Sequence, residues 1–185
     1  MGSASAFQPA RLVVGVLSSP SSAFCSLLES ELERRFGPAE AVGADLEFAW
    51  SGYYDEEMGG RPRRSFLSFA ELVDPGELAA IKAFTNSLER AYMVGGRRGF
   101  NLDPGLLSLS RFVLATTKDR PQRIALSGGI YADLTLVYER GDYRPLPWTY
   151  PDWASEEYRG RLRMLRRGLK AELHSPGPVE REPGA

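Results

Sequence analysis

The chain has 185 residues, of which 43% are hydrophobic and 25% charged, and its formal net charge is −1. This mixture is typical of a globular domain that buries a sizeable core without disulfides. The balanced charge argues against a nucleic-acid-binding protein, which usually carries a basic excess, but it is compatible with a small anionic ligand held by a few arginines.

Two residue counts exclude several kinds of site. Cys25 is the single cysteine and His174 the single histidine. They argue against an intramolecular disulfide, a multi-histidine zinc centre and a histidine-based nucleophile relay. No stretch approaches the ~18 apolar residues of a membrane span. Residues 1–10 lack the basic start and apolar run of a secretion signal. We therefore expect no metal site and no membrane contact, and by default a cytoplasmic location.

Composition divides the chain into three parts. Residues 1–10 are expected to form a disordered leader, residues 11–174 one α/β domain, and residues 175–185, which are rich in Pro, Gly and Glu, a disordered tail.

In the first half of the domain, apolar periodicity predicts strands and helices in alternation. The predicted strands lie at 11–17, 46–50, 63–69 and 100–102, and the predicted helices at 24–36 and 78–92. Gly37 is placed to end the first helix. Asp74-Pro75-Gly76-Glu77 is a helix start, because Asp caps, Pro suits the first turn, and Glu follows three residues after the cap.

The second half repeats that start signal once, at Asp103-Pro104-Gly105, which predicts a further helix as far as about Thr116. Ser127-Gly128-Gly129 between two apolar runs predicts a β-hairpin. The proline-rich segment Pro145–Trp153 is expected to be an ordered loop fixed by aromatic burial, and a last helix is expected from about Ser155.

The element order is therefore βαββαβ followed by a helix, a hairpin and a helix. It predicts an α+β protein with a ferredoxin-like core, in which two helices cover one face of a mostly antiparallel sheet. An open α/β sheet is the alternative.

No motif of a known nucleotide or metal site is present. The chain lacks G-x-x-x-x-G-K-[ST], G-x-G-x-x-G after a strand, and H-E-x-x-H. The acidic loop Asp55-Glu56-Glu57 is either a solvated surface or a set of hard oxygen ligands. Beside it, Tyr53 and Tyr54 suit either the rim of a ligand site or packing against the core.

Asp133 is the most informative polar residue. Strand alternation places it on the same face as Tyr131 within an otherwise apolar strand, where an unpaired carboxylate is costly. It is expected to meet Lys118 or Arg123, either as a structural ion pair or as part of an anion-binding or acid/base site. Asp103 is a further candidate carboxylate of that site.

Two other polar groups have open interpretations. Lys82 and Asn86 share a helix face, which is either solvated or borders the same cavity as Asp133. The last helix is rich in arginine and either forms a solvated surface or docks a partner.

Six segments together resemble a bacterial family, domain of unknown function 4416, over about residues 10 to 160. They are YYDEEMG (53–59), RSFLSF (64–69), IKAFTN (81–86), NLDPG (101–105), ATTKD (115–119) and LPWTYPDW (146–153). Trp50-Ser51-Gly52 departs from the Phe-Thr-Asp-like run of the family, which weakens an acidic site at that loop. The resemblance implies a bacterial cytosolic protein but supplies no activity and no cofactor.

Two functional hypotheses follow. The first is a small-molecule-binding protein or enzyme acting on an anionic ligand, nucleotide-like ligands included. Its candidate ligand-binding residues are Lys118, Arg123, Asp133, Asp103, Tyr131, Tyr53 and Tyr54. The second is a non-enzymatic interaction protein that docks a partner through the basic last helix or the aromatic loop.

Overall fold

The computed structural model describes residues 2–20, 26–42, 46–50, 52–93 and 95–174. Its strands are β1 (Ala10–Ser18), β2 (Ala39–Ala41), β3 (Leu46–Glu47), β4 (Arg63–Val73), β5 (Phe100–Leu107), β6 (Arg111–Thr116), β7 (Arg123–Ala125), β8 (Tyr131–Glu139) and β9 (Asp142–Pro145). Its α-helices are α1 (Ser26–Phe36), α2 (Leu78–Ala91), α3 (Pro151–Ala154) and α4 (Glu156–His174), with short 3-10 turns at η1 (Gly52–Tyr54) and η2 (Pro75–Glu77).

The strands form one sheet in the order β2-β4-β1-β5-β6-β8-β7, with β3 also paired to β4 and β9 to β8. Every strand pair in the described residues is antiparallel. The protein is therefore α+β, as predicted, with a nine-stranded sheet and four α-helices in its described part. None of these helices has the length and apolar character needed to cross a membrane.

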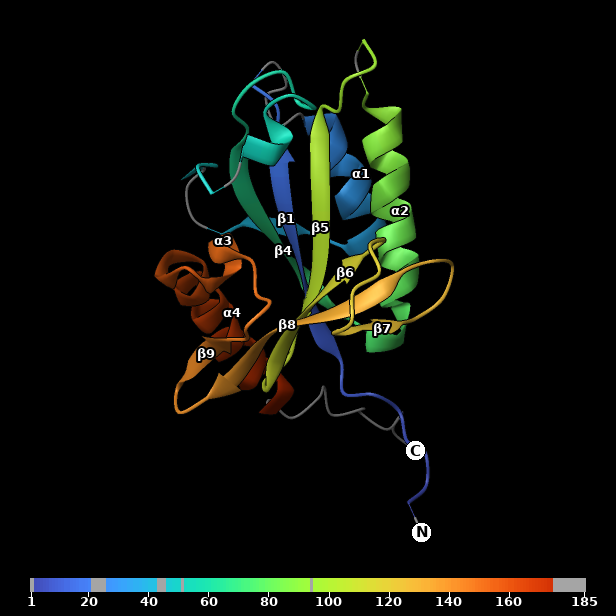
Figure 1. Cartoon of the computed structure of the whole chain (residues 1–185). Helices are drawn as coiled ribbons and strands as arrows, with labels where there is room; N and C mark the ends of the chain where they lie inside the picture. Colours follow the sequence, from blue (N-terminus) through green and yellow to red (C-terminus); the bar gives the residue numbers. More distant parts are fainter. Residues whose placement is uncertain (1, 21–25, 43–45, 51, 94, 175–185) are drawn as a thin grey trace, which may run out of the picture.

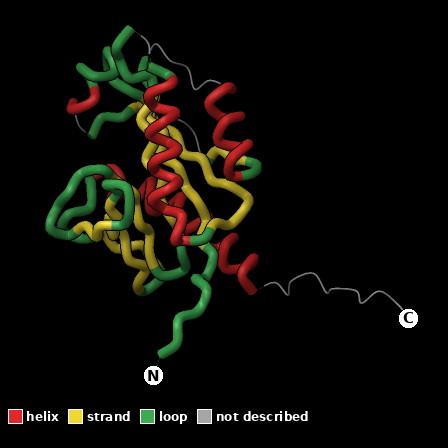
Figure 2. Tube along the Cα trace, turned by 90° about the vertical axis from the view of Figure 1, so that its right-hand side faces the viewer, coloured by secondary structure: helices red, strands yellow, loops and turns green. Residues whose placement is uncertain are grey.

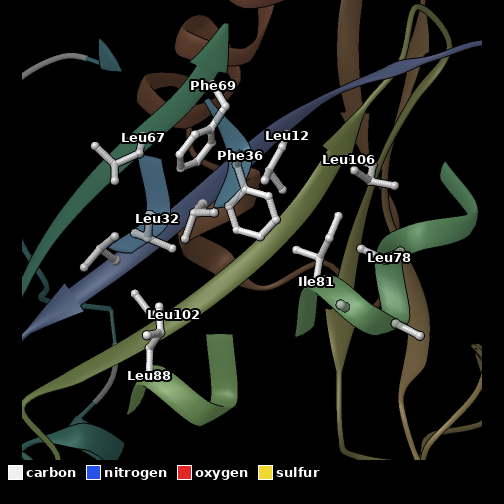
Figure 3. Packing of buried hydrophobic residues seen from close by; sticks show 14 of the residues in the cluster. Leu12, Leu32, Phe36, Leu67, Phe69, Leu78, Ile81, Leu88, Leu102 and Leu106 are labelled. Atoms are coloured by element: carbon white, nitrogen blue, oxygen red, sulfur yellow. The ribbon is translucent and has the colours of Figure 1, made fainter. Parts of the chain in front are cut away.

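Helices cover both faces of the sheet (Figure 1). On one face, α1 and α2 pack against the central strands, and Figure 3 shows Leu32 and Phe36 of α1 and Ile81 and Leu88 of α2 facing the strand residues of this core. Figure 2, turned by 90°, shows the long α2 lying in front of the strands. On the other face, α3 and α4 bury Trp153, Tyr158 and Leu162 in a second core.

Local sequence signals explain several element boundaries. Gly37 has a φ of 80°, which L side chains rarely adopt, and its N–H bonds to Glu33 at the end of α1. The Asp74 carboxylate accepts the N–H of Gly76 at 2.7 Å, so the predicted cap is present at η2, the 3-10 turn that leads into α2. The predicted hairpin is also confirmed, since β7 and β8 pair across Ser127-Gly128-Gly129.

The helix predicted from Asp103-Pro104-Gly105 does not exist. β5 runs through these residues, and a tight turn leads into β6, so the segment is a β-hairpin in which Gly105 pairs with Leu114. Leu107, Phe112 and Leu114 pack in one core and Leu106 and Ala115 in the other, which is the alternation of a strand. Gly105 is needed because a Cβ there would lie 2.5 Å from the Phe112 ring.

Two further expectations change in detail. The strand expected at 46–50 is only Leu46–Glu47, and β2 precedes it at the same edge of the sheet. The proline-rich segment contains the short helix α3, whose Trp153 is 2% exposed, as the expected aromatic burial requires, whereas Trp148 and Tyr150 remain exposed. The last helix begins at Glu156, close to the predicted start.

Candidate functional site

The site forms where two neighbouring strands separate. β5 and β6 pair only between Gly105–Leu107 and Phe112–Leu114, so the start of β5 and the end of β6 diverge (Figure 1). We call this opening the β5–β6 split. Pro104 lies at its base and has no N–H to donate to a partner strand, which suits the point where pairing stops. A cavity of about 630 Å³ occupies the split and is lined by residues from both faces of the sheet.

On the α2 side, two charged side chains bond to the backbone of β5 at Leu102, where β6 does not pair with it. Lys82 donates through Nζ to the carbonyl of Leu102 at 2.7 Å, and Glu89 accepts the Leu102 N–H at 2.8 Å. The two side chains also lie 3.8 Å apart as an ion pair, and both are buried. Burial raises the pKa of Glu89, and Lys82 offsets only part of that effect. Lys82 thus has a structural task and lines the cavity with Asn86, as one of the two interpretations predicted.

On the α3 side, one arginine holds two carboxylates. Arg64 of β4 donates through Nη1 to Asp103 at 3.0 Å and through Nη2 to Asp152 at 3.1 Å, and it is 2% exposed. The Arg64 guanidinium lies against Gly15 of β1. A Cβ at Gly15 would lie 2.8 Å from Arg64 Nη1 and 3.2 Å from the Trp153 ring. The absence of a side chain at Gly15 therefore permits this ion-pair cluster.

The two carboxylates have opposite electrostatic environments. Burial alone would raise the pKa of Asp103, but Arg64, Lys82 and a hydrogen bond from Asn101 outweigh it, and the pKa lies below its ordinary value. For Asp152 burial dominates over Arg64, and the pKa lies above its ordinary value. Asp103 is therefore ionised over a wider pH range than an ordinary aspartate, and Asp152 over a narrower one.

A third group of charges lies at the β7–β8 side of the cavity. Arg123 donates through Nε to Asp133 at 2.7 Å, through Nη1 to the carbonyl of Lys118 at 2.6 Å, and through Nη2 to the Tyr150 hydroxyl at 3.1 Å. Asp133 is buried, so the ion pair expected from the sequence is present, and both partners line the cavity.

Five of the seven candidate residues meet at this cavity: Lys118, Arg123, Asp133, Asp103 and Tyr54. Tyr131 is half-buried in β8 and does not line it, and the side chain of Tyr53 lies outside the described residues, as does Cys25.

Arg64 and Asp152 were not among the candidates. Arg64 had a usable signal, because strand alternation puts it on the same face as the buried Phe66, the same argument that selected Asp133.

Charged residues on the other two candidate surfaces, helix α4 and the acidic loop, form ion pairs or hydrogen bonds within the chain. In α4, Arg159 and Arg163 both pair with Asp142 and Glu156, and Arg166 donates to a backbone carbonyl of the β5–β6 turn. In the acidic loop, Glu57 pairs with Arg98 at 3.2 Å. Within the described residues, no group of three or more His, Cys, Asp or Glu side chains is arranged to hold a metal ion.

The comparisons with known proteins give one match. The family model described as domain of unknown function (DUF4416) matches residues 8–168. The chain belongs to the DUF4416 family. No curated protein and no solved structure matches it. The resemblance noted in the sequence is thereby confirmed for the family, and functional assignment for this DUF4416 chain depends on the geometry of the β5–β6 split.

Proposed function

We propose that this DUF4416 chain binds a small anionic molecule in the cavity of the β5–β6 split. One observation carries the proposal. Arg64, Lys82, Glu89, Asp133 and Asp152 are all the buried charged residues in the described part of the chain, and every one lines this cavity. Charges are expensive to bury, and buried charged groups that gather around one opening are typical of functional sites.

The cavity has the size and charge that such a ligand needs. Its volume of about 630 Å³ lies in the usual range for metabolite and cofactor sites. Six cationic side chains line it against five carboxylates. Arginine and lysine donors bind carboxylate and phosphate groups through charge-assisted hydrogen bonds.

An enzymatic role is consistent with the same site. Asp152 is the candidate general acid, because burial raises its pKa above that of an ordinary aspartate, and Asp103 is a second carboxylate in the same cavity. The alternative hypothesis, docking of a partner through the basic helix, is less well supported, because Arg159, Arg163 and Arg166 already bond within the chain.

The experiment is thermal melting of the protein against nucleotides, phosphorylated metabolites and small carboxylates. A ligand at about 100 times its Kd adds about 2.7 kcal/mol of stability. For a chain of this size that corresponds to a rise of about 5–10 °C in Tm. Such a rise supports the proposal and names the ligand class, and a flat response to the whole panel counts against it.

Two finer expectations accompany this proposal. The strand order β2-β4-β1-β5, with α1 and α2 on one face, supports a ferredoxin-like core to which β6–β9, α3 and α4 are added. The resemblance to a bacterial family supports a bacterial, cytoplasmic protein.

A further inference from the structure

The mouth of the cavity carries large apolar side chains beside the exposed charged residues Glu57, Arg90 and Lys118. Nine large apolar side chains are exposed in the described part of the chain, and three of them line this cavity. They are Trp50, Met93 and Tyr150, each 48% exposed, and they come from three separate segments: before η1, after α2 and before α3. Exposed apolar side chains that gather at one opening mark a binding surface, whereas scattered ones need no explanation.

Aromatic rings are enriched in the lining. Five of the 24 lining residues are aromatic, against 11% of the chain: Phe48, Trp50, Tyr54, Tyr150 and Trp153. Two of them are fixed below the mouth, since Phe48 and Tyr54 meet edge to face with ring centroids 6.0 Å apart. The exposed rings of Trp50 and Tyr150 remain available above them.

One of the exposed aromatic side chains, Tyr150, is hydrogen-bonded to the guanidinium of Arg123. The Tyr150 hydroxyl accepts a hydrogen bond from Arg123 Nη2 at 3.1 Å, so a ring stacked on Tyr150 lies close to that guanidinium. Arg123 uses three of its five N–H groups in its hydrogen bonds to Asp133, the Lys118 carbonyl and Tyr150. Within the described part of the chain, the other two N–H groups of Arg123 are not used in these bonds, and Arg123 lines the cavity.

We propose that the ligand of this cavity is an aromatic anion, with its ring against Trp50 and Tyr150 and its negative group at Arg123. The inference rests on the proposed function and adds the chemical class of the ligand. Stacking of a flat ring on exposed tryptophan and tyrosine is favourable for any ring, whereas a small inorganic or aliphatic anion would leave these two side chains without a partner.

The experiment uses anilinonaphthalene sulfonate, a fluorescent aromatic anion, and phenylnaphthylamine, its neutral counterpart. Both are titrated into the folded protein well below its Tm, with near-ultraviolet circular dichroism to confirm native packing. The anionic dye is expected to bind to the wild type at least tenfold more tightly than the neutral one. Trp50→Ala and Tyr150→Ala should each weaken its binding at least fivefold.

The matched control is Trp148→Ala. Trp148 is also exposed, at 40%, but it does not line the cavity, and its indole N–H bonds to the carbonyl of Leu134. This variant should bind the anionic dye within twofold of the wild type. Equal losses in Trp50→Ala and Trp148→Ala would overturn the inference.

The remaining outcomes separate the inference from the proposed function. If the anionic dye does not bind while inorganic phosphate raises the Tm of the wild type but not of Lys118→Gln, the aromatic inference fails and anion binding stands. If the neutral dye binds as tightly as the anionic one, the anionic part of the inference fails. If phosphate also leaves the Tm of the wild type unchanged, the proposed function fails with it.

Discussion

Arg64 bonds to two carboxylates, and isosteric changes at those two residues should have unequal effects on stability. Because the folded-state pKa of Asp103 is lowered, its ionised form stabilises the fold above its unfolded pKa of about 3.9, and this stability is lost as pH falls through the folded pKa. Because the folded-state pKa of Asp152 is raised, its neutral form stabilises the fold below about pH 3.9, and this stability is lost as pH rises through the folded pKa.

Asp103→Asn should therefore destabilise the protein at pH 7, because it removes charge-assisted hydrogen bonds from Arg64 and Asn101 at 3.0 and 2.9 Å. The expected loss is about 2 kcal/mol, or about 4–8 °C in Tm. Asp152→Asn should change stability by less than about 1 kcal/mol at pH 7, since the amide removes the cost of ionising a buried acid.

The assay is urea unfolding of both variants between pH 3 and pH 8. The loss in Asp103→Asn should shrink as pH falls below about 3.9, because the carboxyl of the unfolded wild type gains its proton there. If Asp152→Asn were the more destabilising variant at pH 7, or if the two losses were equal and independent of pH, the electrostatic account of the cluster would be wrong.

Three further substitutions test local packing and helix capping. Gly15→Ala should cost about 1–3 kcal/mol, because its Cβ would lie 2.8 Å from Arg64 Nη1 and 3.2 Å from the Trp153 ring, whereas Gly168→Ala in α4, with nothing within 4 Å, should stabilise by about 0.5–1 kcal/mol. Equal Tm changes in the two variants would refute the role of Gly15. Asp74→Ala should lower stability by about 1 kcal/mol through loss of the cap before α2, and an unchanged urea midpoint would contradict that cap.

Short sequence motifs predicted several caps and turns correctly, because these features depend on residues that are neighbours in the sequence. The cap at Asp74, the end of α1 at Gly37 and the turn at Ser127–Gly129 each depend on neighbouring residues and on backbone angles that few residue types adopt. The α2 prediction was correct because a cap preceded a long helical period. At Asp103 the same three residues preceded an alternating pattern, and pairing with β1 and β6 overrode the cap signal.

The site was only partly predictable, because most of its contacts join distant positions. Arg123 and Asp133 are ten residues apart in one hairpin, so alternation and turn position together indicated the pair. Arg64 lies 39 residues from Asp103 and 88 from Asp152, and only the strand order brings the three together. The β5–β6 split itself follows from where pairing stops, which no periodicity in the sequence reports.

The most direct test of the central claim is to block the cavity. Asn86 on α2 lines it, whereas the neighbouring Ser87 is exposed and does not, so Asn86→Trp and Ser87→Trp form a matched pair. Both variants are melted with and without an anionic compound that raises the Tm of the wild type. We predict that the rise disappears in Asn86→Trp and is kept in Ser87→Trp, and a full rise in Asn86→Trp would contradict binding in the β5–β6 split.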